Sequence, residues 1–216
     1  MEFGAIIIGD EILTGKREDR HMSRLIGLLA VRGLELAFCE YIGDVPQRIT
    51  HTLRRTYGYG DTAVFCFGGI GATPDDHTRQ CAAAAAGVPL ARHPGAVAEM
   101  EAQFGVMPAD HPRYLMADIP AGCELIPNPF NRVPGFSVGE HHFLPGFPEM
   151  AGPMMEWVLD HRYADLHHAR MVLVLVDLTQ CAGDVVRVDP DGAAEPVAEL
   201  VVLEPARHHH LVVGGV

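Results

Sequence analysis

A glycine-rich loop is the most specific feature of this sequence. Gly68-Gly69-Ile70-Gly71 follows directly on an apolar run at residues 62–67. Glycine lets a backbone approach a ligand closely, and the amides of such a loop and of a following helix can donate to a phosphate. No Gly-Lys-Ser/Thr sequence follows, and Pro74 stands where a dinucleotide fingerprint needs its third glycine. We expect an anion site of another type, the alternative being an ordinary strand-to-helix turn. The candidate ligand-binding residues in this segment are Gly68, Gly69, Gly71, Thr73, Asp75 and Thr78.

Acidic residues follow two further strand-like runs. Gly9, Asp10 and Glu11 come after residues 3–8, and Asp44 comes after residues 34–42. Ligands of open α/β sheets bind at the carboxyl ends of strands, so these loops are predicted to meet the glycine loop. Carboxylates there can hold Mg²⁺ or another divalent cation, or position a water. Asp44 and Asp76 are therefore the candidate catalytic and metal-binding residues, unless both only cap helices.

The histidines and cysteines give weaker indications. His208-His209-His210 lies in a predicted strand, where alternate residues share a face, but no acidic or cysteine pattern accompanies it and we expect no metal site. His141-His142 and His167-His168 are expected to be solvated turn residues. The cysteines are odd in number and have no paired spacing, so we expect small buried apolar residues and no disulfide framework. They are Cys39, Cys66, Cys81, Cys123 and Cys181.

The elements that position these loops alternate in type. Between the predicted strands at residues 3–8, 34–42 and 62–67, a helix is expected to begin at Asp19, with apolar residues at helical spacing and Gly33 at its end. A second helix is expected to be capped by Asp44, and a third, over residues 77–86, by Asp76 or its neighbour. This order predicts an α/β fold: a mostly parallel sheet with helices on both faces, forming three layers.

The second half is predicted to be more irregular. We expect helices at residues 94–104, 112–117 and 147–161, the last interrupted near Gly152-Pro153 and carrying Trp157 in the core or at an oligomer contact. A strand at residues 124–127 and a hairpin at residues 136–144, turning at Gly139-Glu140, are expected as well, the hairpin as an antiparallel accessory to the sheet. Beyond residue 165 the pattern changes to short strands. They are predicted at residues 171–176, 185–188, 197–203 and 208–213. We therefore expect one domain at residues 1–165 and a small β-rich lobe at residues 166–216.

The charge of the chain excludes some partners. Sixteen Lys and Arg against 28 Asp and Glu give a formal charge of -12. Nucleic acid and anionic membranes need basic surfaces, so neither is expected as a partner. The start of the chain has no features of a secretion signal, and its apolar runs are too short to cross a bilayer, which predicts a cytoplasmic protein. An anionic ligand must therefore be attracted by groups at its own binding site, such as backbone amides, a helix N-terminus or a bound cation.

Six segments, in order, resemble the molybdopterin-binding domain of competence/damage-inducible protein A and its relatives. The likeness covers about residues 3–160, and the ordered set is more specific than any one segment. The segments are residues 6–15, Gly43-Asp44, residues 68–78, Pro127-Asn128-Pro129, Pro134-Gly135-Phe136 and residues 144–150.

The resemblance implies a fold, a ligand and an assembly. In the family, the aspartates after the second strand and in the glycine loop line the active pocket, which by motif position are Asp44 and Asp76. Pro145 and Gly146 belong to a segment that borders the same pocket. The implied ligand is molybdopterin or a related phosphorylated pterin or nucleotide, and the implied state is a homo-oligomer, with a dimer as the first expectation and a trimer as the second.

Two other activities stay open, and one is set aside. The resemblance also implies metal-dependent hydrolysis of a nucleotide pyrophosphate such as ADP-ribose, and a non-catalytic sensor or scaffold would keep the same pocket. Full-length relatives often continue into a deamidase domain, and we do not expect that activity in these 216 residues.

Overall fold

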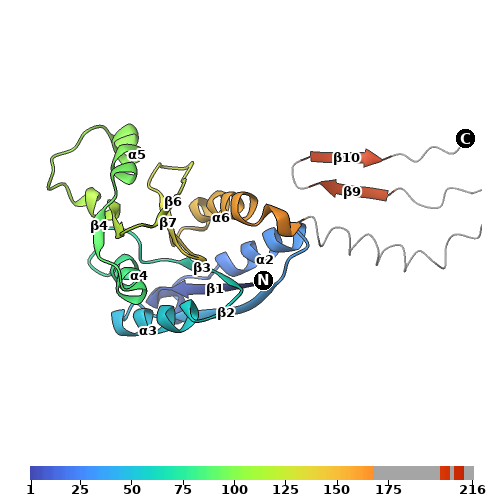
Figure 1. Ribbon diagram of the computed structural model, residues 1–216, viewed down its shortest axis with the longest axis horizontal. Coiled ribbons are helices and arrows are strands. Elements are labelled where there is room, and N and C mark those ends of the chain that lie inside the picture. Colours follow the sequence, from blue (N-terminus) through green and yellow to red (C-terminus); the bar gives the residue numbers. More distant parts are fainter. Residues whose placement is uncertain (168–199, 205–206, 212–216) are drawn as a thin grey trace, which may run out of the picture. The chain divides into compact units, whose positions relative to one another are not determined.

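The computed structural model describes residues 1–167, 200–204 and 207–211 (Figure 1). The chain divides into two compact units, of which the first comprises residues 1–30 and 35–164. All candidate site residues lie in this first unit. None of the helices in the described part of the chain combines the length and apolar composition that crossing a bilayer requires.

The first unit is built on a six-stranded mixed sheet with the order β2-β1-β3-β8-β7-β6. Strands β2, β1, β3 and β8 run parallel, whereas β7 is antiparallel to both of its neighbours. The strands are β1 Glu2–Ile8, β2 Leu36–Ile42, β3 Thr62–Phe67, β6 Glu124–Ile126, β7 Gly135–Val138 and β8 His141–Leu144. All of β3 and all but the first residue of β1 are buried, as expected for inner parallel strands covered on both faces.

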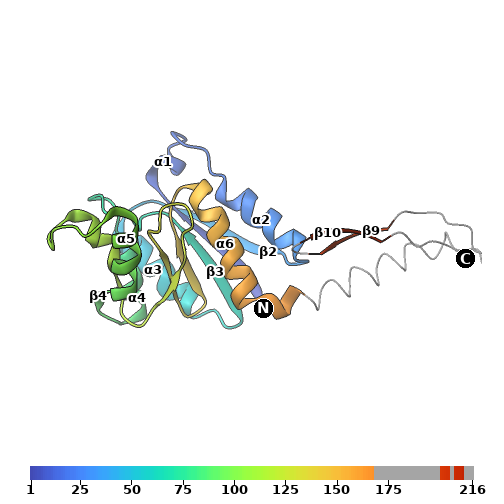
Figure 2. The ribbon, with the colours of Figure 1, turned by 90° about the horizontal axis from the view of Figure 1, so that it is seen from above.

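Helices cover both faces of this sheet, which confirms the α/β prediction (Figures 1 and 2). Helices α2 and α6 lie on one face, and a side chain at Gly152 of α6 would collide with Arg24 of α2. Helices α3 and α4 lie on the other face. The helices are α1 Asp10–Leu13, α2 His21–Val31, α3 Pro46–Tyr57, α4 Thr78–Ala86, α5 Pro94–Phe104 and α6 Pro148–Arg162, with a 3-10 helix, η1, at Pro112–Ala117.

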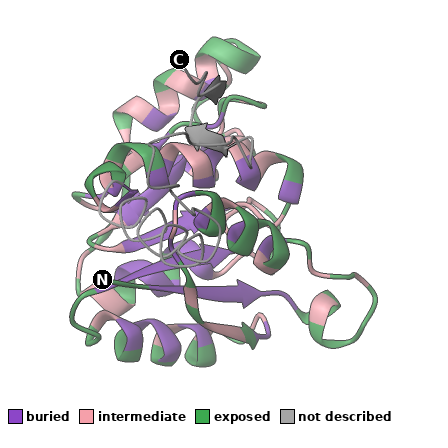
Figure 3. Cartoon of the chain, turned by 90° about the vertical axis from the view of Figure 1, so that its right-hand side faces the viewer, coloured by how far each residue is buried: buried purple, intermediate pink, exposed green. Residues whose placement is uncertain are grey.

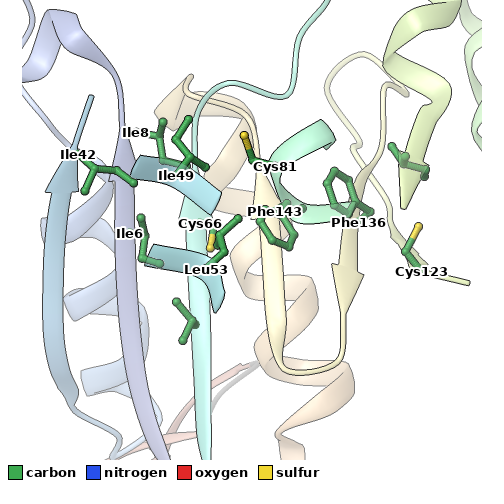
Figure 4. Packing of buried hydrophobic residues seen from close by; sticks show 13 residues of the cluster. Ile6, Ile8, Ile42, Ile49, Leu53, Cys66, Cys81, Cys123, Phe136 and Phe143 are labelled. Carbon is green, nitrogen blue, oxygen red and sulfur yellow. The ribbon is translucent and has the colours of Figure 1, made fainter. Parts of the chain in front are cut away.

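The core between the sheet and helices α3 and α4 is formed by every second residue of the strands and by one face of each helix. Ile6 and Ile8 of β1 alternate along their strand toward Ile49 and Leu53 of α3 (Figure 4). Helix α3 buries positions 49, 52, 53 and 56, the spacing of one helical face. In Figure 3 the helices accordingly combine buried and exposed faces.

The predicted hairpin exists, but its place in the sheet was predicted wrongly. Strands β7 and β8 pair antiparallel around Gly139-Glu140, yet β8 is an inner strand that pairs parallel with β3. His141 and His142 are consequently buried and not solvated. The His141 Nε2 lies 2.8 Å from Thr56 Oγ1, and His142 lies between Ser137 and Tyr163. His167, also expected at the surface, is buried as well.

Two other local features of the structure differ from the prediction. Helix α6 continues through Pro153, because the burial of Met154, Met155, Val158 and Leu159 outweighs the cost of about 3 kcal/mol for a proline in a helix. A small antiparallel pair, β4 Leu90–Arg92 and β5 Asp118–Pro120, was not predicted, since three residues are too few to show an alternation.

The second unit contains an antiparallel pair, β9 Leu200–Glu204 and β10 Arg207–Leu211. These strands overlap two of the predicted runs, at residues 197–203 and 208–213, and the His208–His210 motif lies on β10. The strands predicted at residues 171–176 and 185–188, together with Cys181 and His168, lie outside the described residues. The domain boundary at residue 165 stays a prediction.

Candidate functional site

The carboxyl ends of four strands are joined by backbone hydrogen bonds. The amide of Gly9, just after β1, donates to the carbonyl of Ile42 at the end of β2 (3.0 Å). The amide of Gly68, just after β3, donates to the carbonyl of Leu144 at the end of β8 (3.0 Å). The loops predicted to converge are therefore held side by side at one edge of the sheet.

Gly68 has a conformation and a packing environment that only glycine suits. Its φ is +100°, and a Cβ there would lie 2.2 Å from the carbonyl oxygen of Ile8. A Cβ at Gly146, on the neighbouring loop, would lie 3.4 Å from the Cα of Gly68. Gly69 also has a positive φ, of +68°. The loop therefore turns sharply as it leaves β3, against the end of β1.

Four consecutive amides of the glycine loop are available to a ligand. Within residues 1–167, 200–204 and 207–211, the N–H groups of residues 69–72 donate to no acceptor. The amide of Thr78, by contrast, donates to the carbonyl of Gly69 (2.9 Å). The first amide of α4 is thus hydrogen-bonded to the loop. The free amide donors belong mainly to the loop and not to the helix. Successive free amides form a concavity that suits an anion.

A buried guanidinium supports the loop from behind. Arg79 donates to the carbonyl of Gly71 (2.9 Å), to that of Asp118 (2.9 Å) and to that of Leu115. Burial lowers the pKa of Arg79, and the charges of Asp76 and Asp118 raise it. Arginine keeps its charge in such surroundings. Arg79 thus fixes Gly71 and places a positive charge near the candidate anion site.

Asp76 does not cap α4, which corrects one of the two capping predictions. The cap position of α4 is His77, and no side chain caps that helix. Asp76 Oδ2 instead accepts from the amide (2.8 Å) and the hydroxyl (2.5 Å) of Thr73. A Cβ at Gly71 would lie 2.5 Å from the same oxygen. Asp76 therefore folds back over the glycine loop and shapes it.

Asp44 does not cap α3 either, because that helix begins with Val45 at its cap position and Pro46 in its first turn. Asp44 Oδ2 accepts from the amide of Asp10 (2.8 Å), and the amide of Asp44 donates to Asp10 Oδ1 (3.2 Å). Burial raises the pKa of Asp44, and so do the charges of Asp10, Glu11 and Asp75. The segment after Gly9, expected to be a loop, is the short helix α1.

A cavity of about 620 Å³ opens over these loops. Most of the predicted site residues line it, whereas Asp10 holds the Asp44 loop beside it and Thr78 is buried below the glycine loop. The predicted residues at the wall are Gly9, Glu11, Asp44, Gly68, Gly69, Gly71, Thr73, Asp75, Asp76, Pro145 and Gly146.

Among the cavity residues that were not predicted, five bring charged or aromatic side chains to its wall. Arg17 lies over the ring of Phe147 (5.2 Å), and Arg113 lies over the ring of Phe104 (4.0 Å). These two arginines add positive charge to a wall that also carries carboxylates. The fifth is His21, which begins α2. Only the spacing of Asp19 and His21 could have indicated it, and that spacing is too common to be specific.

The described residues contain no group of three or more His, Cys, Asp or Glu side chains that could hold a metal ion. The two predicted metal ligands, Asp44 and Asp76, both reach the cavity. Mg²⁺ is often held by one or two carboxylates together with the phosphates of a substrate. A cation here would therefore need further oxygen ligands, from water or from a bound phosphate.

The fold and this loop arrangement define an α/β protein of a known family. The family described as "Probable molybdopterin binding domain" matches residues 4–165, and the chain belongs to it. This confirms the resemblance found in the sequence.

Among its relatives are CinA-like proteins of several bacteria. The one from Anaeromyxobacter dehalogenans (strain 2CP-C) is 34% identical over 176 residues, covering 77% of this chain and 42% of the relative. The one from Geobacter sp. (strain M21) is 34% identical over 166 residues, covering 74% of this chain and 40% of the relative. The chain thus spans about two fifths of the length of these relatives.

Two solved structures share the architecture. The protein CinA from Thermoplasma acidophilum, described as of unknown function, has a TM-score of 0.65 and 28% identity over 76% of this chain and 97% of its own. The molybdopterin biosynthesis Mog protein from Mycobacterium ulcerans has a TM-score of 0.50 and 16% identity, covering 77% of this chain and 97% of its own. The second likeness concerns the fold alone.

Proposed function

We propose that the cavity binds molybdopterin or a related phosphorylated pterin or nucleotide, with the phosphate at the glycine loop. The observation that carries this proposal is the run of four free amides at residues 69–72 in the wall of a cavity of about 620 Å³. That volume is within the range of small-molecule sites. Membership of the family supports the pterin as the first ligand to test.

The remaining walls suit the rest of such a molecule. A flat heterocycle can pack against the aromatic rings of Phe104 and Phe147, which are partly exposed. Arg17 and Arg113 accompany these rings and offset part of the local negative charge. A protein with a formal charge of -12 needs such local attraction to bind an anion.

Asp44 and Asp76 are proposed to act beside the phosphate. We propose that they hold Mg²⁺ together with ligand phosphates, as two carboxylates commonly do. Each is fixed by hydrogen bonds from a loop amide, so their positions are set before a ligand binds. Mg²⁺ would supply charge neutralisation at the phosphate.

A second candidate function is hydrolysis of a nucleotide pyrophosphate such as ADP-ribose. Two carboxylates beside a candidate phosphate site favour it, because carboxylates can position an attacking water as well as a cation. A sensor or scaffold would bind the same molecules without turnover. Binding and product formation must therefore be measured together.

The test is a titration of the purified protein with molybdopterin, ADP-ribose and GMP, with and without Mg²⁺, following heat and product. GMP is included because guanine shares the 2-amino-4-oxopyrimidine ring of a pterin. We expect saturable binding of a phosphorylated ligand that Mg²⁺ strengthens. Asp76→Asn should weaken it about tenfold, whereas Asp110→Asn, an exposed control outside the cavity, should not. Absence of binding to all three molecules would contradict the proposal.

A further inference from the structure

His21 is a buried histidine in the wall of the cavity. His21 is 4% exposed, and its ring packs against the ring of Phe67, with the two ring centroids 4.8 Å apart. Phe67 is the last residue of β3, directly before the glycine loop. His21 therefore lies beside the point where the predicted phosphate site begins.

Asp19 fixes which nitrogen of His21 carries the proton. Asp19 Oδ1 lies 2.9 Å from His21 Nδ1 and also accepts from the His21 amide, at 2.9 Å. Asp19 Oδ2 accepts from the Met22 amide and the Tyr41 hydroxyl. Burial raises the pKa of Asp19, but these hydrogen bonds lower it overall. An ionised carboxylate only accepts, so Nδ1 must be the protonated nitrogen.

The other ring nitrogen, Nε2, then carries a lone pair. Burial lowers the pKa of His21, although Asp19 opposes this change, and the lowered pKa favours the neutral ring at pH 7. Within the described part of the chain, Nε2 is buried and has no hydrogen-bond partner. An unpaired buried polar atom is costly and rare in native proteins. Here it belongs to a side chain that lines a cavity large enough for a ligand.

We propose that His21 Nε2 is the hydrogen-bond acceptor that selects ligands carrying an N–H or O–H donor at the Phe67 side of the cavity. A pterin or guanine ring offers such donors at its ring amide and amino groups. The Asp19–His21 pair sets the direction of the hydrogen bond before the ligand arrives, which lowers the cost of ordering the site. This inference rests on the proposed function, since it names a contact within the same cavity.

The experiment combines ¹⁵N-histidine NMR with calorimetry, using GMP as the probe. At pH 7 the free protein should show His21 Nδ1 protonated and Nε2 unprotonated, and GMP should move the Nε2 resonance. His21→Phe keeps a flat ring against Phe67 and removes the acceptor. It should weaken GMP binding about tenfold, the usual scale for one hydrogen bond. His77→Phe, beside the glycine loop but outside the cavity lining, should bind GMP as the wild type does.

Three results would contradict the inference in different ways. A wild type that does not bind GMP overturns it, and the proposed function falls too if molybdopterin and ADP-ribose also fail to bind. Equal GMP affinity of the wild type and His21→Phe overturns the inference alone. If His21→Phe does not fold, the NMR measurement on the wild type decides, since a protonated Nε2, or one that GMP leaves unchanged, overturns the inference as well.

Discussion

Asp10 and Asp44, 34 residues apart in the chain, each accept a hydrogen bond from the other's backbone amide, at 3.2 and 2.8 Å. The pair joins the loop after β1 to the loop after β2. It also directs the Asp44 carboxylate to the cavity wall and away from the helix that it was predicted to cap. Two acidic side chains are thus held side by side by backbone donors, which orders this edge of the cavity.

Replacing Asp44 with Asn should separate its structural role from its proposed role in binding. The amide oxygen can still accept from the Asp10 amide. Because burial and neighbouring carboxylates raise the pKa of Asp44, its ionisation is less favourable in the folded state than in the unfolded chain. Asp44→Asn should therefore not lower the melting temperature.

In the same variant, Mg²⁺-assisted binding of GMP should weaken about tenfold by calorimetry. Asp61→Asn is the matched control, since Asp61 precedes β3 at the end of the strand remote from the glycine loop. A variant with unchanged GMP affinity in Mg²⁺ would show that Asp44 only holds the loops together.

Replacing Gly68 with Ala should destabilise the protein strongly. The added Cβ would lie 2.2 Å from the Ile8 carbonyl oxygen, so the end of β1 or the loop must move, at a cost of about 2 to 4 kcal/mol. Gly87→Ala has a similar positive φ but open space around it, and should cost only about 1 to 2 kcal/mol. Urea unfolding measures both. Equal losses would mean that the loop does not pack against β1 as described.

Buried histidines should make stability depend on pH. Burial lowers the pKa of His141 to about 4, and His142 is shifted in the same direction. An unfolded histidine takes up its proton near pH 6.5. Between about pH 6.5 and 4 the unfolded state therefore binds more protons than the folded state, and stability is lost as the pH falls through this range.

The expected loss from His141 is on the order of 3 kcal/mol, to be measured by urea unfolding at several pH values. His141→Gln removes the titration and can keep a hydrogen bond to Thr56. Near pH 5, the free energy of unfolding of this variant should change less steeply with pH than that of the wild type, by about 1.4 kcal/mol per pH unit. An unchanged slope would indicate that His141 titrates normally.

The protein is predicted to be a homo-oligomer, with a dimer expected first and a trimer second. Helix α6 buries Met154, Met155, Val158 and Leu159 within the chain, while Met150 and Trp157 stay partly exposed. Partly exposed apolar side chains on a helix are suited to contacts between copies. Light scattering at micromolar concentration should give two or three times the mass of one chain. The mass of a single chain would contradict this prediction.

The sequence predicted those parts of the fold and the site that depend on local pattern. The runs at residues 3–8 and 62–67, the glycine loop after the second, and the helix ended by Gly87 are all evident in the order of residue types. The sheet position of β8 is not, because the partner of a strand is chosen by packing across the whole unit. His141 was therefore placed at the surface and lies in the core.

The side-chain partners at the site could not be predicted for the same reason. An aspartate before a helix suggests an N-cap, but the Asp44 carboxylate accepts a hydrogen bond from the Asp10 amide, 34 residues away. The Asp76 carboxylate accepts one from the Thr73 amide, within its own loop. His21 reaches the cavity only because α2 packs beside the end of β3. Such contacts depend on the assembled fold.

The most direct test of the proposed site is an NMR titration of the ¹⁵N-labelled protein with GMP and, separately, with guanosine. The amide resonances of residues 69–72 should shift saturably with GMP, because their free N–H groups are proposed to bind the phosphate. Guanosine, which lacks the phosphate, should leave these four amides nearly unchanged. If GMP binds without moving them, or if both molecules move them equally, the glycine loop is not the phosphate site.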